Sequence, residues 1–129
     1  LQEQIAAAAR STPAPVVLKY EPFVLHVCCQ DLPTATRLYQ CAVDSGHKNS
    51  GISVGKQWPV VAVRSTLCAE SIVAKDGRVL ASEDFLVANF LDIEKKFELN
   101  LSRIEKFQKL IRLRLSSSVG CDENGVSVE

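Results

Sequence analysis

Apolar residues recur every three or four positions over a long stretch that approaches the C-terminal end of the chain. The members of this stripe are Leu86, Phe90, Ile93, Phe97, Leu101, Ile104, Phe107 and Ile111. The period predicts a helix of roughly 30 residues, about 45 Å long. Ser82 fits its N-cap, and Glu83 and Asp84 fit the first turn, where the helix dipole favours carboxylates. We interpret the stripe as core packing.

Two shorter helices are predicted upstream. Residues 1–10 are rich in alanine, the best helix former, and the prolines of "STPAP" end that helix. A second helix begins after Asp31, which can act as its N-cap, with Pro33 in the first turn. Gly46 closes it in the usual C-terminal role. Its expected buried face consists of Ala35, Leu38, Tyr39 and Ala42.

β-Branched and aromatic residues predict strands between these helices. The expected strands cover residues 16–29, 58–66, 69–74 and 78–82. Pro22 lies inside the first of them and implies an edge position or a bulge. A bulge would bring Glu21 and His26 to one face of that strand, whereas strict alternation places them on opposite faces. The last two strands are expected to form a hairpin about Lys75, Asp76 and Gly77.

The order of these elements indicates an α+β fold with a largely antiparallel sheet, flanking helices and a long C-terminal helix. A strand followed by a glycine-rich turn that opens a helix is absent from the sequence, so the fold is not expected to be Rossmann-like. We expect a single domain over residues 1–115. Serine, glycine and acidic residues dominate residues 116–129, which predicts a disordered tail.

Composition restricts the classes of function. The formal net charge is zero, so nucleic-acid binding would need a local basic patch. No apolar run reaches the length of a membrane-spanning helix, and the N-terminal residues lack a signal pattern. The five cysteines are odd in number and show no C-x-x-C spacing, so we expect no metal site and reduced thiols in a cytoplasmic protein. The chain begins at Leu1 and has no methionine, and we therefore expect that upstream sequence is missing.

The stretch "AVDSGHKNSGISVG", residues 42–55, holds three of the six glycines of the chain within ten residues. Small polar and basic residues separate these glycines. One interpretation is a turn, because glycine is common where the backbone reverses. The other is a loop that lets a ligand approach the backbone closely.

This stretch and three others resemble the family of tRNA methyltransferases of wybutosine synthesis. The four segments are "LKYEPFVLHV", "AVDSGHKNSGISVGK", "AVRST" and "NLSRIEKF", and the likeness covers about residues 16–107. Two features depart from the family. An upstream Ser-Cys-Ser/Ala-Gly-Arg motif is absent, and Leu67 and Ile72 stand where the family has His and Pro, while Glu70 is kept.

The resemblance implies an N-methyltransferase that uses S-adenosylmethionine. Its substrate would be a tricyclic guanosine precursor beside the anticodon of phenylalanine tRNA, and its fold would be the family's own α+β type. Methyl transfer to a ring nitrogen depends mainly on positioning, so small residues that admit the cofactor are expected in the site. The residues expected to bind the cofactor are Ser45, Gly46, Asn49, Ser50, Gly51, Arg64 and Thr66.

Other candidates lie in the matching segments at either end. Glu21 and His26 are the expected catalytic residues. Glu21 would accept hydrogen bonds from ribose hydroxyls or from the amino-acid side chain of the substrate. His26 would accept a proton near neutral pH, and a packed strand histidine is the alternative. Asn100 and Arg103 share a helix face, and with Lys106 and Lys109 they are expected to contact the tRNA backbone; a solvated helix face is the alternative. Two other functions stay open: a non-catalytic tRNA- or cofactor-binding module, and a protein-interaction domain.

Overall fold

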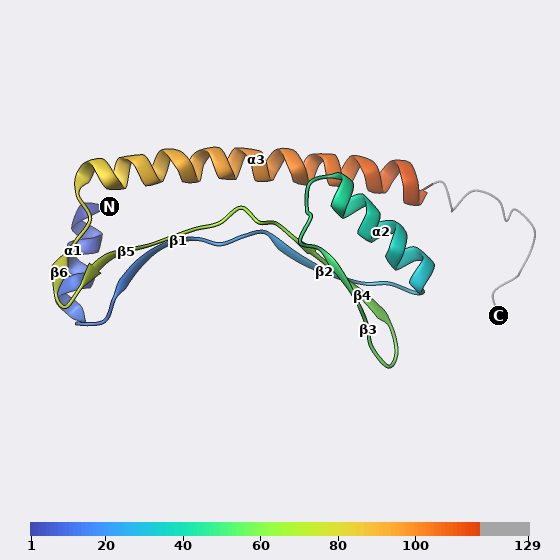
Figure 1. Ribbon diagram of the computed structural model, residues 1–129, viewed down its shortest axis with the longest axis horizontal. Coiled ribbons are helices and arrows are strands. Elements are labelled where there is room, and N and C mark those ends of the chain that lie inside the picture. Colours follow the sequence, from blue (N-terminus) through green and yellow to red (C-terminus); the bar gives the residue numbers. More distant parts are fainter. Residues whose placement is uncertain (117–129) are drawn as a thin grey trace, which may run out of the picture. The chain divides into compact units, whose positions relative to one another are not determined.

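The computed structural model describes residues 1–116 (Figure 1). These residues form two compact units. Unit 1 comprises Leu1–Pro22 and Leu67–Asn100. Unit 2 comprises Phe23–Thr66 and, among the described residues, 101–116. The division falls inside the long helix α3, Glu83–Leu115. Whether the two units act as the single domain expected over residues 1–115 stays a prediction.

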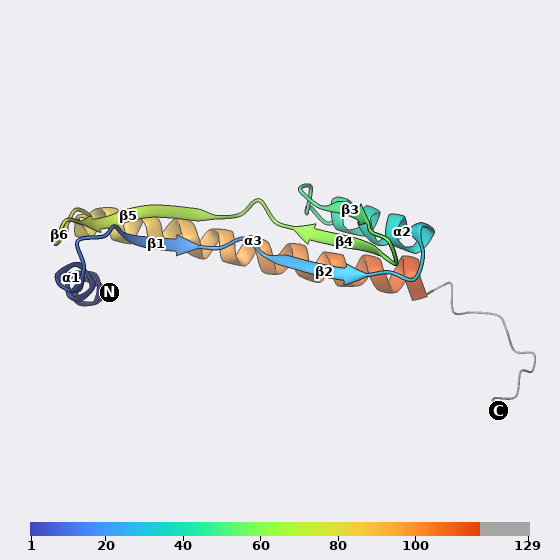
Figure 2. The ribbon, with the colours of Figure 1, turned by 90° about the horizontal axis from the view of Figure 1, so that it is seen from below.

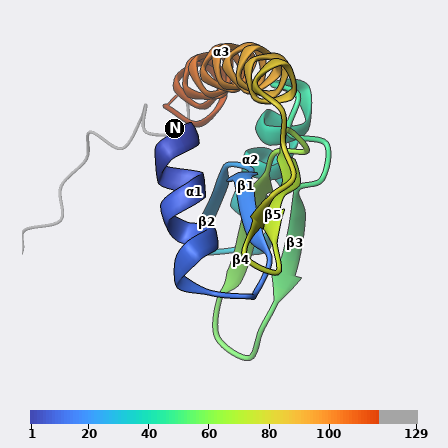
Figure 3. The ribbon, with the colours of Figure 1, turned by 90° about the vertical axis from the view of Figure 1, so that its left-hand side faces the viewer.

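Unit 1 contains helix α1, Gln2–Ser11, and a three-stranded antiparallel sheet in the order β1-β5-β6. The strands are β1, Val16–Tyr20, β5, Ala69–Lys75, and β6, Arg78–Val79. Helix α1 contacts all three strands. Figure 3 shows α1 beside β1. The core of this unit consists of Ile5, Ala9, Val73, Ala74 and Leu86.

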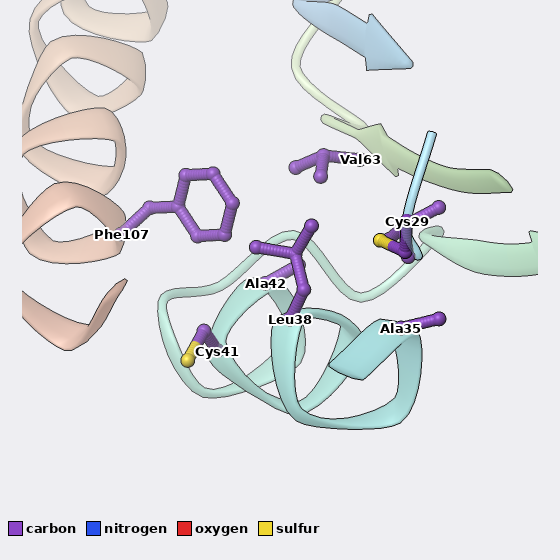
Figure 4. Close-up of a cluster of buried hydrophobic side chains, with 8 residues drawn as sticks. Cys29, Ala35, Leu38, Cys41, Ala42, Val63 and Phe107 are labelled. Carbon is purple, nitrogen blue, oxygen red and sulfur yellow. The ribbon is translucent and has the colours of Figure 1, made fainter. Parts of the chain in front are cut away.

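Unit 2 contains a second three-stranded antiparallel sheet in the order β2-β4-β3, with helix α2 packed on β4 and β3. Its elements are β2, Val24–Cys28, α2, Leu32–Asp44, β3, Gly51–Val54, and β4, Pro59–Arg64. Figure 2 shows β2 and β4 side by side. In the core, Phe107 points toward Leu38, Ala42 and Val63 (Figure 4).

Most of the expected elements are confirmed, and so is the α+β class, within residues 1–116. Helix α3 extends over 33 residues, and Phe85 N–H donates to the capping Ser82 Oγ. Asp31 accepts from Thr34 N–H at 2.7 Å as the N-cap of α2. The expected hairpin turns through Asp76 and Gly77, both at positive φ, although β6 is only two residues long.

Two expectations about strands were wrong. The single strand over residues 16–29 is broken at Pro22, and its halves β1 and β2 belong to different sheets. Proline has no N–H to donate to a ladder, and the chain leaves the first sheet there. Strand β3 was not expected. It has only four residues, and the turn-forming residues around Gly51 leave no alternation long enough to predict a strand.

The stripe of α3 is buried at only two of its positions. Leu86 and Phe107 are each 4% exposed, whereas Phe97 and Leu101 are 51% and 46% exposed. The interpretation as core packing is therefore wrong for the middle of the stripe, because the period shows which face is apolar and not what covers it. Within residues 1–116, no helix combines the length and the apolar character needed to cross a membrane. The predicted tail from residue 117 on lies outside the described residues.

Candidate functional site

The candidate site in unit 2 begins where α2 ends. His47 N–H donates to Ala42 O, and Gly46 N–H donates to Val43 O, which is the hydrogen-bond pattern of a Schellman motif. Gly46 has a φ of +102°, which side chains rarely adopt. A Cβ there would also lie 2.9 Å from Nε of Arg103. Gly46 is thus favoured by its backbone conformation, and a Cβ at this position would make the Arg103 side chain shift.

The motif places His47 in the interior of unit 2. Its side chain is 0% exposed, and its ring lies 5.6 Å from that of Phe23 and 5.8 Å from that of Phe107. Ser45 Oγ lies 2.9 Å from His47 Nδ1. Ser45 donates its one hydroxyl proton to Ala42 O at 2.8 Å, so it accepts from Nδ1–H. In the neutral ring, this network assigns an unprotonated Nε2 with a free lone pair.

Electrostatics keep this ring neutral. Burial lowers the pKa of His47, and the nearby Arg103 charge lowers it further. His47 Nε2 and Arg103 Nη1 are both buried, and neither has a hydrogen-bond partner in the described part of the chain. Unit 2 therefore contains one unsatisfied acceptor and one unsatisfied cationic donor.

Ser50 ties the glycine-rich stretch to the end of β4. Its Oγ donates to His47 O at 2.6 Å and accepts from Arg64 N–H at 3.0 Å. The next residue, Gly51, begins β3, and a Cβ built on it would meet no atom within 4 Å. In contrast to Gly46, Gly51 is not required by packing or by a positive φ.

Strand pairing brings three of the expected residues to one face of the sheet. Ala62 of β4 pairs with His26 on one side and with Gly51 on the other. Residues that pair directly share a face, and Arg64 shares it too, two residues along β4 from Ala62. His26 and Arg64 are exposed. Ala62 is the residue that lies between His26 of β2 and Gly51 of β3. The side chains of His26 and Arg64 are thus open to solvent on this face.

The remaining candidates are more scattered. Asn49 is exposed in the turn before β3, and Thr66 is exposed beyond the end of β4. Glu21 belongs to unit 1, where its carboxylate lies 3.0 Å from Lys19 Nζ at the surface. The bulge hypothesis for Glu21 and His26 is wrong, because the two residues do not share a strand.

The four residues of α3 that were expected to contact tRNA differ in exposure. Asn100 is 7% exposed, and its Oδ1 has no partner within residues 1–116. Arg103 is half-buried against Gly46. Lys106 and Lys109 are exposed, as a contact with a phosphate backbone requires.

Sequence reasoning missed His47. The available signal was its position directly after the helix-closing glycine, where the chain folds back on the last turn of the helix. Within residues 1–116, no group of three potential metal ligands is present, and Cys28, Cys29, Cys41 and Cys68 are free thiols.

Two hollows lie away from these residues. One of about 500 Å³ in unit 1 is lined by Leu86, Phe90 and their neighbours. Another of about 440 Å³ in unit 2 is lined by Leu25, Phe107 and their neighbours. Neither hollow contains an expected cofactor residue, so the chemistry of the side chains, and not the size of a hollow, locates the candidate site.

A family model and several curated relatives match this chain, and they all point to one family. A family model described as "Methyltransferase TYW3" matches residues 1–113. The chain is 38% identical over 114 residues to a "tRNA wybutosine-synthesizing protein 3 homolog" from Xenopus laevis, covering 88% of this chain and 45% of the relative. It is 35% identical over 113 residues to the homologue from Homo sapiens, covering 87% and 44%. The chain thus spans less than half the length of these relatives.

A solved structure shares the fold. The PH1069 protein from Pyrococcus horikoshii superposes with a TM-score of 0.74 at 19% identity, over 88% of this chain and 59% of that one. This likeness concerns the fold alone, because the identity is low.

Proposed function

Because the chain belongs to the family described as "Methyltransferase TYW3", we propose that it takes part in the S-adenosylmethionine-dependent N-methylation of a wybutosine precursor base in phenylalanine tRNA. The names of its relatives support this pathway. The observation that carries the proposal is the face of the unit 2 sheet on which His26, Gly51 and Arg64 meet.

The residues of unit 2 fit a methyl donor. The open space over Gly51 admits a ligand to the backbone, and the exposed His26 and Arg64 on the same face offer polar contacts. S-Adenosylmethionine, when bound, supplies a methyl group on a sulfonium. The protein's task is then to hold the acceptor nitrogen in line with that methyl. In this proposal the exposed His26 accepts the proton that the base releases.

Replacing Gly51 by Val tests the role of the sheet face. The change should barely affect folding, because Gly51 lies in a strand at an ordinary φ with free space around its Cα. Methylation of phenylalanine tRNA that carries the wybutosine precursor base should nevertheless be lost, because the valine side chain fills the space that the methyl donor would occupy over Gly51. The assay would use this chain fused to the region of the Xenopus laevis relative that it does not span.

Gly55→Val is the matched control. Gly55 also has an ordinary φ, and its nearest non-neighbouring atom is Trp58 O at 3.8 Å. We expect this variant to keep both its melting temperature and its activity. Full activity in Gly51→Val would show that the glycines are turn residues and would remove the support for a cofactor loop.

We propose further that Lys106 and Lys109 contact the tRNA backbone. Each lost phosphate contact lowers the slope of log K against log salt by about 0.7–0.9. Replacing both by Ala should therefore flatten the salt dependence of tRNA binding by about 1.4–1.8. Replacing the exposed Lys75 and Lys95 of unit 1 by Ala is the control and should leave the slope unchanged. Binding of tRNA without any binding of the methyl donor would instead favour a non-catalytic module.

A further inference from the structure

The charged residues of the chain are unevenly divided between the two units. Among the described residues, unit 2 contains nine lysines and arginines and only three acidic residues, Asp31, Asp44 and Glu105. Asp44 is itself neutralised by its ion pair with Arg114. Unit 1 contains nine acidic and six basic residues. Although the formal net charge of the chain is zero, unit 2 therefore attracts polyanions and unit 1 repels them.

The loop that joins β3 to β4 is exposed along its whole length. Val54 of β3 pairs with Pro59 of β4, and residues 55–58 connect the two strands. Every residue of this loop is exposed, and so are Ser53 and Val54 before it. Figure 1 shows the loop as the free end of the β3–β4 hairpin. The side chains of the loop are thus open to a partner.

Trp58 in this loop is the one tryptophan of the chain. Tryptophan is highly buried on average, yet Trp58 is 53% exposed. Within residues 1–116, the aromatic ring contacts join other residues, and none of them includes Trp58. A role in core packing therefore does not explain this residue. An indole ring held open to solvent at the end of a hairpin is suited to stacking on a flat partner.

The neighbours of Trp58 narrow the class of partner. Lys56 is exposed in the same loop, and Lys48 is exposed before β3. A ring for stacking and cations for phosphates are the two features with which proteins bind single-stranded nucleic acid. A membrane surface fits less well, because binding to it grows with the buried apolar area, and the loop offers only one large apolar side chain.

We propose that the β3–β4 loop binds single-stranded RNA, with the indole of Trp58 stacked on an unpaired base and Lys56 in contact with a neighbouring phosphate. Resting on the proposed function, this RNA is the part of phenylalanine tRNA around its anticodon. Val54, where the loop begins, lies about 10 Å along β3 from Gly51 at the rise of a strand. The base on Trp58 is therefore a near neighbour of the base that is methylated. Gly55 contributes no side chain, so the contact depends on Lys56 and Trp58.

The fluorescence of Trp58 reports on this loop alone, because the chain has no second tryptophan. The probes are a short single-stranded RNA, the same sequence in a duplex, phenylalanine tRNA, and phosphatidylserine vesicles. We expect the single strand and the tRNA to quench the emission of Trp58 in a saturable way. The duplex should leave the emission nearly unchanged, because its bases are already stacked on one another.

Variants measured with a fluorescently labelled single-stranded RNA separate stacking from charge. Trp58→Ala should weaken binding by about 5- to 150-fold, and Trp58→Phe should retain much of the affinity because its ring still stacks. Leu80→Ala, which truncates a similarly exposed side chain of unit 1, is the control and should leave binding unchanged. Lys56→Ala should lower the slope of log K against log salt by about 0.7, whereas the exposed Lys75→Ala of unit 1 should not.

The outcomes separate this inference from the proposed function. Binding of tRNA that leaves the emission of Trp58 unchanged, or that is equally tight in Trp58→Ala, overturns the loop contact and leaves the methylation proposal standing. Quenching by the short RNA without any binding of phenylalanine tRNA supports the loop contact and contradicts the tRNA substrate. A blue shift on vesicles without quenching by RNA would assign the loop to a membrane surface, and equal quenching by the duplex would contradict stacking. The melting temperature of each variant shows whether it has folded.

Discussion

The two units have similar frameworks, each with a three-stranded antiparallel sheet and helical segments, but they bury different residues. The core of unit 1 is aliphatic. Among the described residues, three of the four buried polar side chains belong to unit 2: Ser45, His47 and Ser65. Buried polar groups lower stability unless they are satisfied, and Ser45 is satisfied by its bonds to Ala42 O and His47 Nδ1. Unit 2 therefore combines its apolar core with a buried hydrogen-bonded pair, which the described core of unit 1 lacks.

The largest expected effect comes from emptying the core of unit 2. Phe107→Ala should cost about 3–5 kcal/mol of unfolding free energy, because it leaves a cavity between α2 and β4 and removes the ring that packs on His47. Leu86→Ala in unit 1 should cost about 2–5 kcal/mol. Urea unfolding measures both values, and the exposed Leu101→Ala is the control, within about 0.5 kcal/mol of the unmodified chain.

Hydrogen exchange can then show whether the units open separately. We expect Phe107→Ala to lower amide protection mainly in β4 and Leu86→Ala mainly in β5, because each residue packs in a different core. Equal loss of protection in both strands would mean that the two units unfold as one.

The glycines provide a second, smaller contrast. Gly77→Ala in the unit 1 hairpin should cost about 1–2 kcal/mol, because alanine is strained at a φ of +73°. Gly46→Ala should cost more, about 1–3 kcal/mol for the backbone with the displacement of Arg103 in addition. Gly51→Ala should be nearly neutral. Thermal unfolding of the three variants would give this ranking, and equal costs at Gly46 and Gly77, which both have a positive φ, would contradict an added cost from Arg103.

A third contrast between the units is the pH dependence of the unfolding free energy, which the buried His47 gives to unit 2. The pKa of His47 is lowered, so the unfolded chain takes up a proton near pH 6.5 and the folded chain only at lower pH. Stability is therefore complete above this pH and falls below it, by at most about 1.4 kcal/mol per pH unit. Urea titrations from pH 5 to 8 should show this slope in the unmodified chain and in His26→Gln, but not in His47→Gln. A slope that persists in His47→Gln would assign it to another group.

The sequence predicted the features that depend on local patterns. The period of apolar residues indicated α3, and Asp31 and Gly46 marked both ends of α2, because caps and periods involve residues close in the chain. The sequence indicated only an edge position or a bulge at Pro22, since the assignment of β1 and β2 to separate sheets depends on distant partners. Strand β3 is short and begins with glycine, and only its pairing with β4 defines it.

The candidate site was predictable to a similar degree. His26, Gly51 and Arg64 were identified from motifs, but their common face follows from the pairing register of three strands. His47 was missed because its burial depends on Phe23 and Phe107, which are distant in sequence. Arg103 was interpreted as a surface residue, because a basic run on a helix does not show which of its members meets another element.

The smallest expected effect on stability concerns the N-cap of α2 in unit 2. The charge at this cap is that of the exposed Asp31 carboxylate. The Thr34 N–H that donates to Asp31 holds the pKa of this carboxyl below its ordinary value. The ionised cap thus stabilises the fold above the pKa of the unfolded carboxyl, and this contribution is lost as the pH falls through the lower, folded value. Asp31→Asn keeps an acceptor for Thr34 but removes the charge. Its melting temperature should therefore fall only slightly at pH 7 and should match that of the unmodified chain in strong acid. Glu98 is a suitable control, because Glu98→Gln changes an exposed carboxyl of unit 1 that lies away from the ends of its helix. A difference between Asp31→Asn and the unmodified chain that persists unchanged into strong acid would show that the cap acts through its geometry alone and not through its charge.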